Sequence, residues 1–319
     1  MCSARCFVST TTFAWVGFNL FVLAMLAVDL GIVNRKAHVV SAREAGVWVG
    51  VWMTLAVAFG VGLYFVRGPD PALEFFTGYI IEYTLSMDNI FVFVLILTYF
   101  AVPPAQQHRV LFWGILGALV MRGAMIVVGT ALITRFHWII YVFGGFLIFT
   151  GIRMAVRREE EVHPERNPLI KAVRRLIPVT EDYEGRHFFV RRDGVRMATP
   201  LLVVLVMIES TDLVFALDSI PAIFAVTQDP FTVYTSNVFA ILGLRSLYFV
   251  LRGAMGRFHY LQVSLAAVLC FVGAKMVLTD VYKIPIALSL VVIVFVLGAG
   301  VGASLVRERL RSASPSDSQ

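Results

Sequence analysis

The stretch Ile80–Leu97, IIEYTLSMDNIFVFVLIL, places two carboxylates inside a segment that is otherwise apolar. An α-helix needs about 20 mostly apolar residues to cross a bilayer, and this stretch lies within such a run. A charged side chain at the bilayer centre is costly, so Glu82 and Asp88 are expected to face a bundle interior or a wet cavity. The stretch therefore predicts a membrane-spanning helix with a polar, functional face.

The rest of the chain has the same apolar character. Of its 319 residues 59% are hydrophobic and 15% are charged, against about 45–50% and about 25% in soluble domains. These values predict an all-α, polytopic membrane protein whose partner is the lipid bilayer. The net charge of +6 then reports membrane topology and gives no reason to expect a nucleic-acid partner. The three cysteines show no spacing typical of a disulfide framework or a zinc site.

We expect about nine transmembrane helices within a single transmembrane domain, residues 1–319. A polar loop, residues 156–199, lies between the fifth and sixth helices. The C-terminal segment 312–319, SASPSDSQ, is expected to be disordered. The nine apolar segments are 11–33, 45–66, 73–99, 110–132, 137–155, 200–226, 232–251, 260–279 and 284–306.

The distribution of Lys and Arg predicts the orientation of the bundle. If the 156–199 loop is cytoplasmic, 20 of the 27 basic residues lie inside, 4 lie outside and 3 fall within helices. Cytoplasmic loops of membrane proteins carry an excess of Lys and Arg. We therefore expect a bacterial inner (plasma) membrane protein with its N-terminus outside and its C-terminus in the cytoplasm.

An internal repeat relates two groups of three helices. EYTLSMDNI, which begins at residue 82, matches DLVFALDSI, which begins 130 residues later, and GILG matches AILG at an offset of 126. RFHWI and RFHYL, and then GIRM and GAKM, match at 122. Because three is an odd number, the second copy must insert upside down, as in the inverted repeats of many secondary transporters. Residues 73–155 and 200–279 are the two expected copies; chance similarity between apolar helices is the alternative.

Five acids fall in the two matching helices. In the repeat alignment Glu82 corresponds to Asp212 and Asp88 to Asp218, and Glu209 precedes the second pair. On a regular helix Glu82 and Asp88 point about 120° apart. One cavity can therefore collect all five acids only if the helices unwind or kink. Pro221, which frees the carbonyl of Leu217, offers a means, and Asn89 and Ser219 add polar groups beside the acids.

The ligand types favour a hard divalent cation. The polar side chains within these helices are mainly carboxylates, hydroxyls and amides. The histidines lie outside the helix cores, and Cys270 is the only embedded thiol. Oxygen ligands suit magnesium, calcium and manganese, whereas copper and zinc prefer thiolate and imidazole. Ligand type does not separate the three hard ions. The predicted metal ligands are Glu82, Asp88, Glu209, Asp212 and Asp218.

Three basic residues also lie within the helices, namely Arg122, Arg245 and Lys275. Buried charges must be paired or wetted. In the functional interpretation these cations pair with the acids when metal is absent. In the structural interpretation Arg122 and Lys275 form fixed bridges or reach the membrane surface, which applies best to Lys275 because it lies near a helix end.

At these residues the chain resembles the TerC family of integral membrane proteins. The motifs are EYTLSMDNIFVF, ESTDLVFALDSIPAIFAVTQDPF and SNVFAILGLRSLYF, with the FHYLQ…GAKM pattern further on, and HFFVRRDG before ATPLL resembles its Alx-like, pH-responsive branch. The resemblance covers nearly the whole chain. The resemblance implies that the chain belongs to a family that is grouped with LysE-type exporters and named for tellurite resistance. Members of this family are implicated in manganese export. The resemblance also places the five acids, with Asn89, Ser219 and Pro221, in the acidic motifs.

Three classes of function remain open at this point. The first is a transporter that exports divalent metal, with Mn²⁺ as the expected ion and protons as a possible counter-ion, because carboxylates hold either metal or protons. The second is a membrane scaffold or stress-resistance sensor in which the acids are packing bridges. The third is an intramembrane enzyme that uses paired carboxylates. We expect a transporter without enzymatic activity and without a permanently bound cofactor.

Overall fold

A computed structural model describes residues 2–28, 41–156, 170–172, 175, 177–185, 187–192, 194–252 and 260–313. The side chains of residues 2–11, 42, 88 and 308–313 lie outside this description. By its internal contacts the chain divides into two units, Met1–Val40 and Ser41–Gln319. The first unit contains α1 (Cys2–Val28), and the second contains all the other elements.

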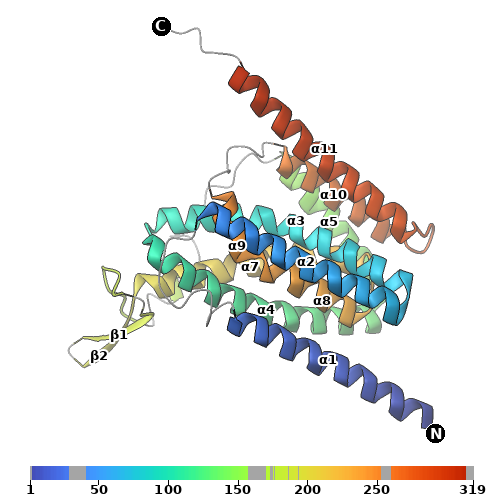
Figure 1. Ribbon diagram of the computed structural model, residues 1–319, viewed down its shortest axis with the longest axis horizontal. Coiled ribbons are helices and arrows are strands. Elements are labelled where there is room, and N and C mark those ends of the chain that lie inside the picture. The colour runs from blue at the N-terminus through green and yellow to red at the C-terminus, as the bar shows by residue number, and fades with distance from the viewer. Residues whose placement is uncertain are drawn as a thin grey trace. The chain divides into compact units, whose positions relative to one another are not determined.

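The second unit is built from long helices and one short hairpin (Figure 1). The hairpin pairs β1 with β2 in antiparallel register and lies inside the 156–199 loop, for which no strand was expected. The elements are α2 (Ala42–Arg67), α3 (Pro69–Tyr99), α4 (Pro104–Arg135), α5 (Ile139–Val156), β1 (Phe189–Arg192), β2 (Val195–Ala198), α7 (Pro200–Phe224), α8 (Pro230–Leu242), α9 (Leu244–Leu251), α10 (Leu261–Val277) and α11 (Ile286–Ala313).

The length and composition of these helices confirm a polytopic all-α membrane protein. Six helices in the described part are long and apolar enough to cross a bilayer, and the bent pair α8 and α9 raises the number to seven. The described apolar parts of α1 and α10, Thr12–Val28 and Leu261–Val277, are shorter. Each expected segment overlaps a helix, but the exact number of nine spans stays a prediction. Helix α11 continues to Ala313, so the first two residues of the expected disordered tail are helical, and residues 314–319 lie outside the description.

Local sequence signals fix where these helices begin. Proline opens α3, α4, α7 and α8, where its missing N–H has no helical partner in any case and its fixed φ suits the first turn. Asp229 caps α8 by accepting a hydrogen bond from the backbone N–H of Thr232 at 3.2 Å. Gly68 has a φ of 96°, which only glycine adopts without strain, and it forms the tight connection between α2 and α3.

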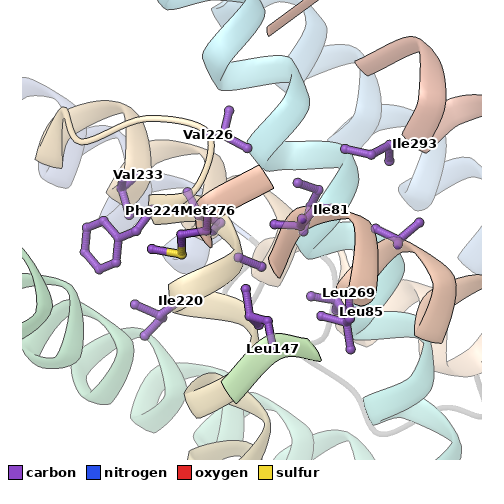
Figure 2. Packing of buried hydrophobic residues seen from close by; sticks show 14 of the residues in the cluster. Ile81, Leu85, Leu147, Ile220, Phe224, Val226, Val233, Leu269, Met276 and Ile293 are labelled. Atoms are coloured by element: carbon purple, nitrogen blue, oxygen red, sulfur yellow. The ribbon is translucent and has the colours of Figure 1, made fainter. Parts of the chain in front are cut away.

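Helices α3 and α7 pack at the centre of the second unit. Figure 2 shows Ile81 and Leu85 of α3 with Ile220 and Phe224 of α7 in one apolar cluster, which Leu147 of α5 completes. Helices α10 and α11 contribute to the same cluster. The acidic motifs therefore lie on the two helices that share the core.

Glycines bring α5 and α10 into close contact. A Cβ atom on Gly144 would lie 2.9 Å from the carbonyl oxygen of Gly273, and one on Gly151 would lie 2.8 Å from that of Ala266. At the repeat offset of 122 residues, Gly144 corresponds to Ala266 and Gly151 corresponds to Gly273. The two contacts are therefore equivalent, with the roles of α5 and α10 exchanged. An inverted repeat predicts such a reciprocal pair. Superposition of whole three-helix units is a stricter condition, so the repeat itself stays a prediction.

The connections gather basic residues at one end of the bundle. Arg109 near the start of α4 stacks on Phe188 at 5.1 Å, and Arg252 after α9 donates a hydrogen bond to Gln107 of α4 at 3.1 Å. At the opposite end Arg67 pairs with Asp229 at 2.9 Å. These contacts agree with the expectation that the loops with Arg109 and Arg252 lie at one end and the loop with Arg67 at the other. The side of the membrane on which each end lies stays a prediction.

Candidate functional site

Arg122 of α4 lies at the centre of a buried charge cluster. Its side chain is 1% exposed, and its guanidinium contacts one acid from each of two other helices. Nη2 donates to Oδ1 of Asp212 at 2.9 Å and Nε donates to Oδ2 of the same carboxylate at 3.1 Å. Nη1 donates to Oε1 of Glu82 and also lies 3.3 Å from the hydroxyl of Ser219. The cluster thus joins α3, α4 and α7.

The energetics of this cluster depend on complete pairing. Glu82 is 0% exposed and Asp212 is 2% exposed, so neither carboxylate exchanges its hydrogen bonds with bulk water. An arginine fork matches a carboxylate at two points, which is the geometry that offsets the cost of burying both charges. Two carboxylates face one guanidinium, however, and Oε2 of Glu82 has no hydrogen-bond partner among the described residues. The cluster therefore retains one carboxylate oxygen that can accept a proton or a cation.

The position of Glu82 and Asp212 agrees with the repeat alignment, in which these two acids correspond. They come from different helices and meet the same guanidinium. Arg122 therefore pairs with two of the five acids, whereas the exchange of this pairing for a metal ion stays a prediction. Sequence reasoning named Arg122 only as a supporting residue, because nothing in the linear order shows that α4 packs on α7 with Arg122 facing both acids.

Glu209 lies one helical turn before Asp212 and packs against the backbone of α4. A Cβ atom on Gly117 would overlap the carboxylate of Glu209, so any other residue at this position would force the acid to move from its place. The GILG motif was used to align the repeat, but its second glycine also has this steric role. The motif alone does not indicate this role, because it depends on which helix Glu209 faces.

Asp218 points to a different neighbour. Its carboxylate forms a side-chain hydrogen bond with Thr150 of α5 and experiences the charge of Arg153 on the same helix. Asp88 lies within α3, but its side chain lies outside the described part of the chain. Glu82 and Asp212 are therefore brought together, whereas Asp218 belongs to a separate contact with α5.

The expected unwinding of α3 and α7 is not found in the described structure, whereas a kink that gathers the acids stays a prediction. Both helices are continuous, and Pro221 lies within α7, whose last residue is Phe224. The break falls instead at Gly243, where α8 and α9 meet at 40°. Among the described side chains no group of three or more His, Cys, Asp and Glu could hold a metal ion in this conformation. The five-acid metal site therefore stays a prediction.

Arg245 lies directly after this break and faces the same region. Arg245 and Asp212 line one small cavity, whose remaining walls come from α3, α4, α7 and α9. Its apolar lining residues are Phe93, Leu111, Gly114, Ile115, Ala118, Ile208 and Leu244. The cavity places a second cation beside the carboxylate that Arg122 holds.

Lys275 lies in the last turn of α10. Its side chain is 8% exposed, and its ammonium has no hydrogen-bond partner in the described structure. Glu74 of α3 is the acid whose charge it experiences, and Glu74 itself accepts a hydrogen bond from Thr227 at 2.6 Å. Asn89, the remaining supporting residue, is 4% exposed in α3. Neither residue joins the Arg122 cluster through a contact that the structure describes.

Comparison with known proteins identifies the family. The model of the integral membrane protein TerC family matches residues 67–312. The chain belongs to the TerC family. It is 54% identical over 303 residues to an uncharacterized membrane protein of Myxococcus xanthus, covering 95% of both chains. It is 48% identical to a Salmonella typhi protein and 47% identical to an Escherichia coli K12 protein, each covering 90% of this chain and 92% of the other.

Both enterobacterial relatives carry the printed name "Putative membrane-bound redox modulator Alx". The match extends across α3 to α11 and includes every helix of the Arg122 cluster. No solved structure matches this chain. The resemblance to the Alx-like branch is therefore confirmed at the level of sequence.

Proposed function

We propose that this TerC-family protein carries a hard divalent cation across the membrane, with Mn²⁺ as its expected substrate and protons as the exchanged ion. The observation that carries the proposal is the buried cluster of Arg122, Glu82 and Asp212. Ionisable groups deep in a membrane protein are costly, and they typically mark ion pathways or proton relays. A purely structural bridge would need one carboxylate for one guanidinium, whereas this cluster contains two.

Arg122 acts in this proposal as a tethered cation that occupies the acids when no substrate is present. A divalent ion that reaches Glu82 and Asp212 competes with the guanidinium for the same oxygens. Carboxylates bind a proton or a metal but not both at one oxygen, so metal entry releases protons. Export of metal against import of protons follows if the two ions alternate at this site.

The remaining acids extend this path in the proposal. Glu209 lies one turn from Asp212, and Asp88 of α3 and Asp218 of α7 correspond in the repeat alignment. A rearrangement that brings them to the Arg122 cluster would complete a set of oxygen ligands, which suits Mn²⁺, Mg²⁺ and Ca²⁺. Manganese is chosen among these ions because of the resemblance to TerC proteins.

The test replaces acids by amides of the same size. Asp88→Asn with Asp218→Asn removes two charges, and Asp70→Asn at the exposed start of α3 is the matched control. Cells that express the double variant should lose tolerance to high manganese although the protein still accumulates in the membrane. Cells with the control should keep it. Normal manganese tolerance in the double variant would favour the scaffold or sensor function instead.

A further inference from the structure

The β1–β2 hairpin is fixed at the point where α7 begins. Only Thr199 separates Ala198 of β2 from the first residue of α7, and its backbone N–H donates to the carbonyl of Phe188 at 3.0 Å. The preceding loop is tied to the end of α3, since the hydroxyl of Tyr183 donates to the carbonyl of Phe100 at 2.7 Å. The hairpin is therefore held beside the ends of two apolar, membrane-spanning helices, as Figure 1 shows for α7.

One face of the hairpin carries two arginines side by side. The strand register places Arg191 directly opposite Arg196, so their side chains project from the same face, which also carries Phe189. Both arginines and Phe189 are exposed. Like charges directly opposite each other destabilise a strand pair, so the arrangement favours an anion that bridges them.

Neighbouring contacts hold these arginines in place. The guanidinium of Arg196 lies 4.4 Å from the centre of the Phe189 ring, and Nε of Arg191 donates to the carbonyl of Gly194 at 3.2 Å. No hydrogen bond of the described structure uses the two Nη atoms of Arg191. Guanidinium forks bind the oxygens of a phosphate at two points, which a lysine does not.

Aromatic residues beside the hairpin indicate how close it lies to the lipid. Phe188, which precedes β1, stacks under Arg109 of α4, and Trp113 one turn further along α4 contacts the Phe188 ring with centroids 6.4 Å apart. Trp113 is 44% exposed on a membrane-spanning helix. Exposed tryptophan together with arginine is typical of the boundary between hydrocarbon and headgroups.

We propose that the face of Phe189, Arg191 and Arg196 binds the phosphate headgroups of anionic phospholipids and thereby fixes the start of α7 at the membrane surface. Phe189 enters the headgroup layer, and the two guanidinium groups share one or two phosphates. Basic residues near an anionic membrane each strengthen binding by about fivefold. The inference does not depend on the transported ion, so its failure leaves the proposed function unaffected.

The experiment uses the full-length protein in neutral detergent and measures the midpoint of thermal unfolding. Added phosphatidylglycerol, phosphatidylcholine and inorganic phosphate are compared for the wild type and for Arg191→Gln with Arg196→Gln. The matched control is Arg192→Gln, which lies on the opposite face of the same strand and pairs with Glu184. The wild type and the control should show a shift with phosphatidylglycerol alone, and the double variant should lose most of that shift.

Three results would overturn the proposal. An unchanged phosphatidylglycerol shift in the double variant would place the lipid elsewhere. An equal shift with phosphatidylcholine would show that the headgroup charge is irrelevant. A full shift with inorganic phosphate at the same concentration would assign the face to a free anion.

Discussion

Arg122 on α4 and Asp212 on α7 form a two-point ion pair, with Nη2 2.9 Å from Oδ1 and Nε 3.1 Å from Oδ2. Glu82 of α3 shares the same guanidinium. One positive charge thus joins the consecutive helices α3 and α4 to the distant helix α7 within an apolar bundle. The consequences of this arrangement can be tested by changing the charges one at a time and together.

Replacing Arg122 by Gln should destabilise the protein strongly. Glu82 and Asp212 would remain buried without a counter-charge, and removing one partner of a buried ion pair costs about 3–5 kcal/mol. We expect a lower midpoint of thermal unfolding in detergent and less protein in the membrane. Adding Glu82→Gln and Asp212→Asn should restore much of that stability, although not transport. A single Arg122→Gln variant as stable as the wild type would contradict the central role of this cluster.

Gly117→Ala should displace Glu209 while leaving α4 helical. The added Cβ overlaps the carboxylate of Glu209, whereas in Gly123→Ala it meets Tyr234 at an ordinary 3.5 Å. The overlapping atoms are the end of a flexible side chain, so the acid should move with little loss of stability. We expect Gly117→Ala to lower manganese tolerance and Gly123→Ala to keep it, with membrane levels measured by immunoblot. Equal tolerance in the two variants would show that the position of Glu209 does not matter for transport.

Gly273→Ala should separate α5 from α10. Its Cβ would lie 2.7 Å from the carbonyl oxygen of Gly144, which cannot move without shifting the helix backbone. Gly145→Ala is the control on α5, since nothing lies within 4 Å of the added atom. The unfolding midpoint of Gly273→Ala should fall below that of Gly145→Ala. If the inverted repeat holds, Gly151→Ala should reproduce the effect, because Gly151 is the repeat partner of Gly273.

Asp280, in the connection before α11, predicts a pH dependence. Hydrogen bonds from Tyr141 and His137 hold the pKa of this carboxyl below its ordinary value of 3.8. A lowered pKa in the folded state stabilises the protein at pH values above 3.8, and the effect is lost as the pH falls through the folded-state pKa. Asp280→Asn should therefore lower the unfolding midpoint at neutral pH, and the difference should vanish in strong acid. A difference that is constant across this range would exclude the mechanism.

The sequence predicted much of this fold because a membrane helix needs little besides length and hydropathy. The bounds expected for the helix that contains Glu82, 73–99, lie within α3, and Pro69 explains the earlier start. The bend at Gly243 was missed because the apolar run continues through it without a proline. The hairpin was missed too, although FFVRRDGVRMA contains an Asp-Gly pair between two β-prone runs, which is a known turn signal.

The candidate site was less predictable than the fold. The long apolar runs and the repeat identified the acids and the correspondence of Glu82 with Asp212. They did not identify Arg122 as the shared partner, because that contact depends on how α4 packs against α7. The directions of Glu209 and Asp218 also depend on which helix each acid faces, and a linear motif does not contain that information.

The measurement that tests the central claim most directly is uptake of Mn²⁺ into inverted membrane vesicles, with and without an imposed pH gradient. In such vesicles an exporter loads the lumen. The account predicts that vesicles with the wild-type protein accumulate Mn²⁺ faster than vesicles without it. It also predicts that an acidic lumen accelerates uptake and that Asp88→Asn with Asp218→Asn abolishes it. Equal uptake by wild-type vesicles and by vesicles with the double variant, at either pH gradient, would contradict the account.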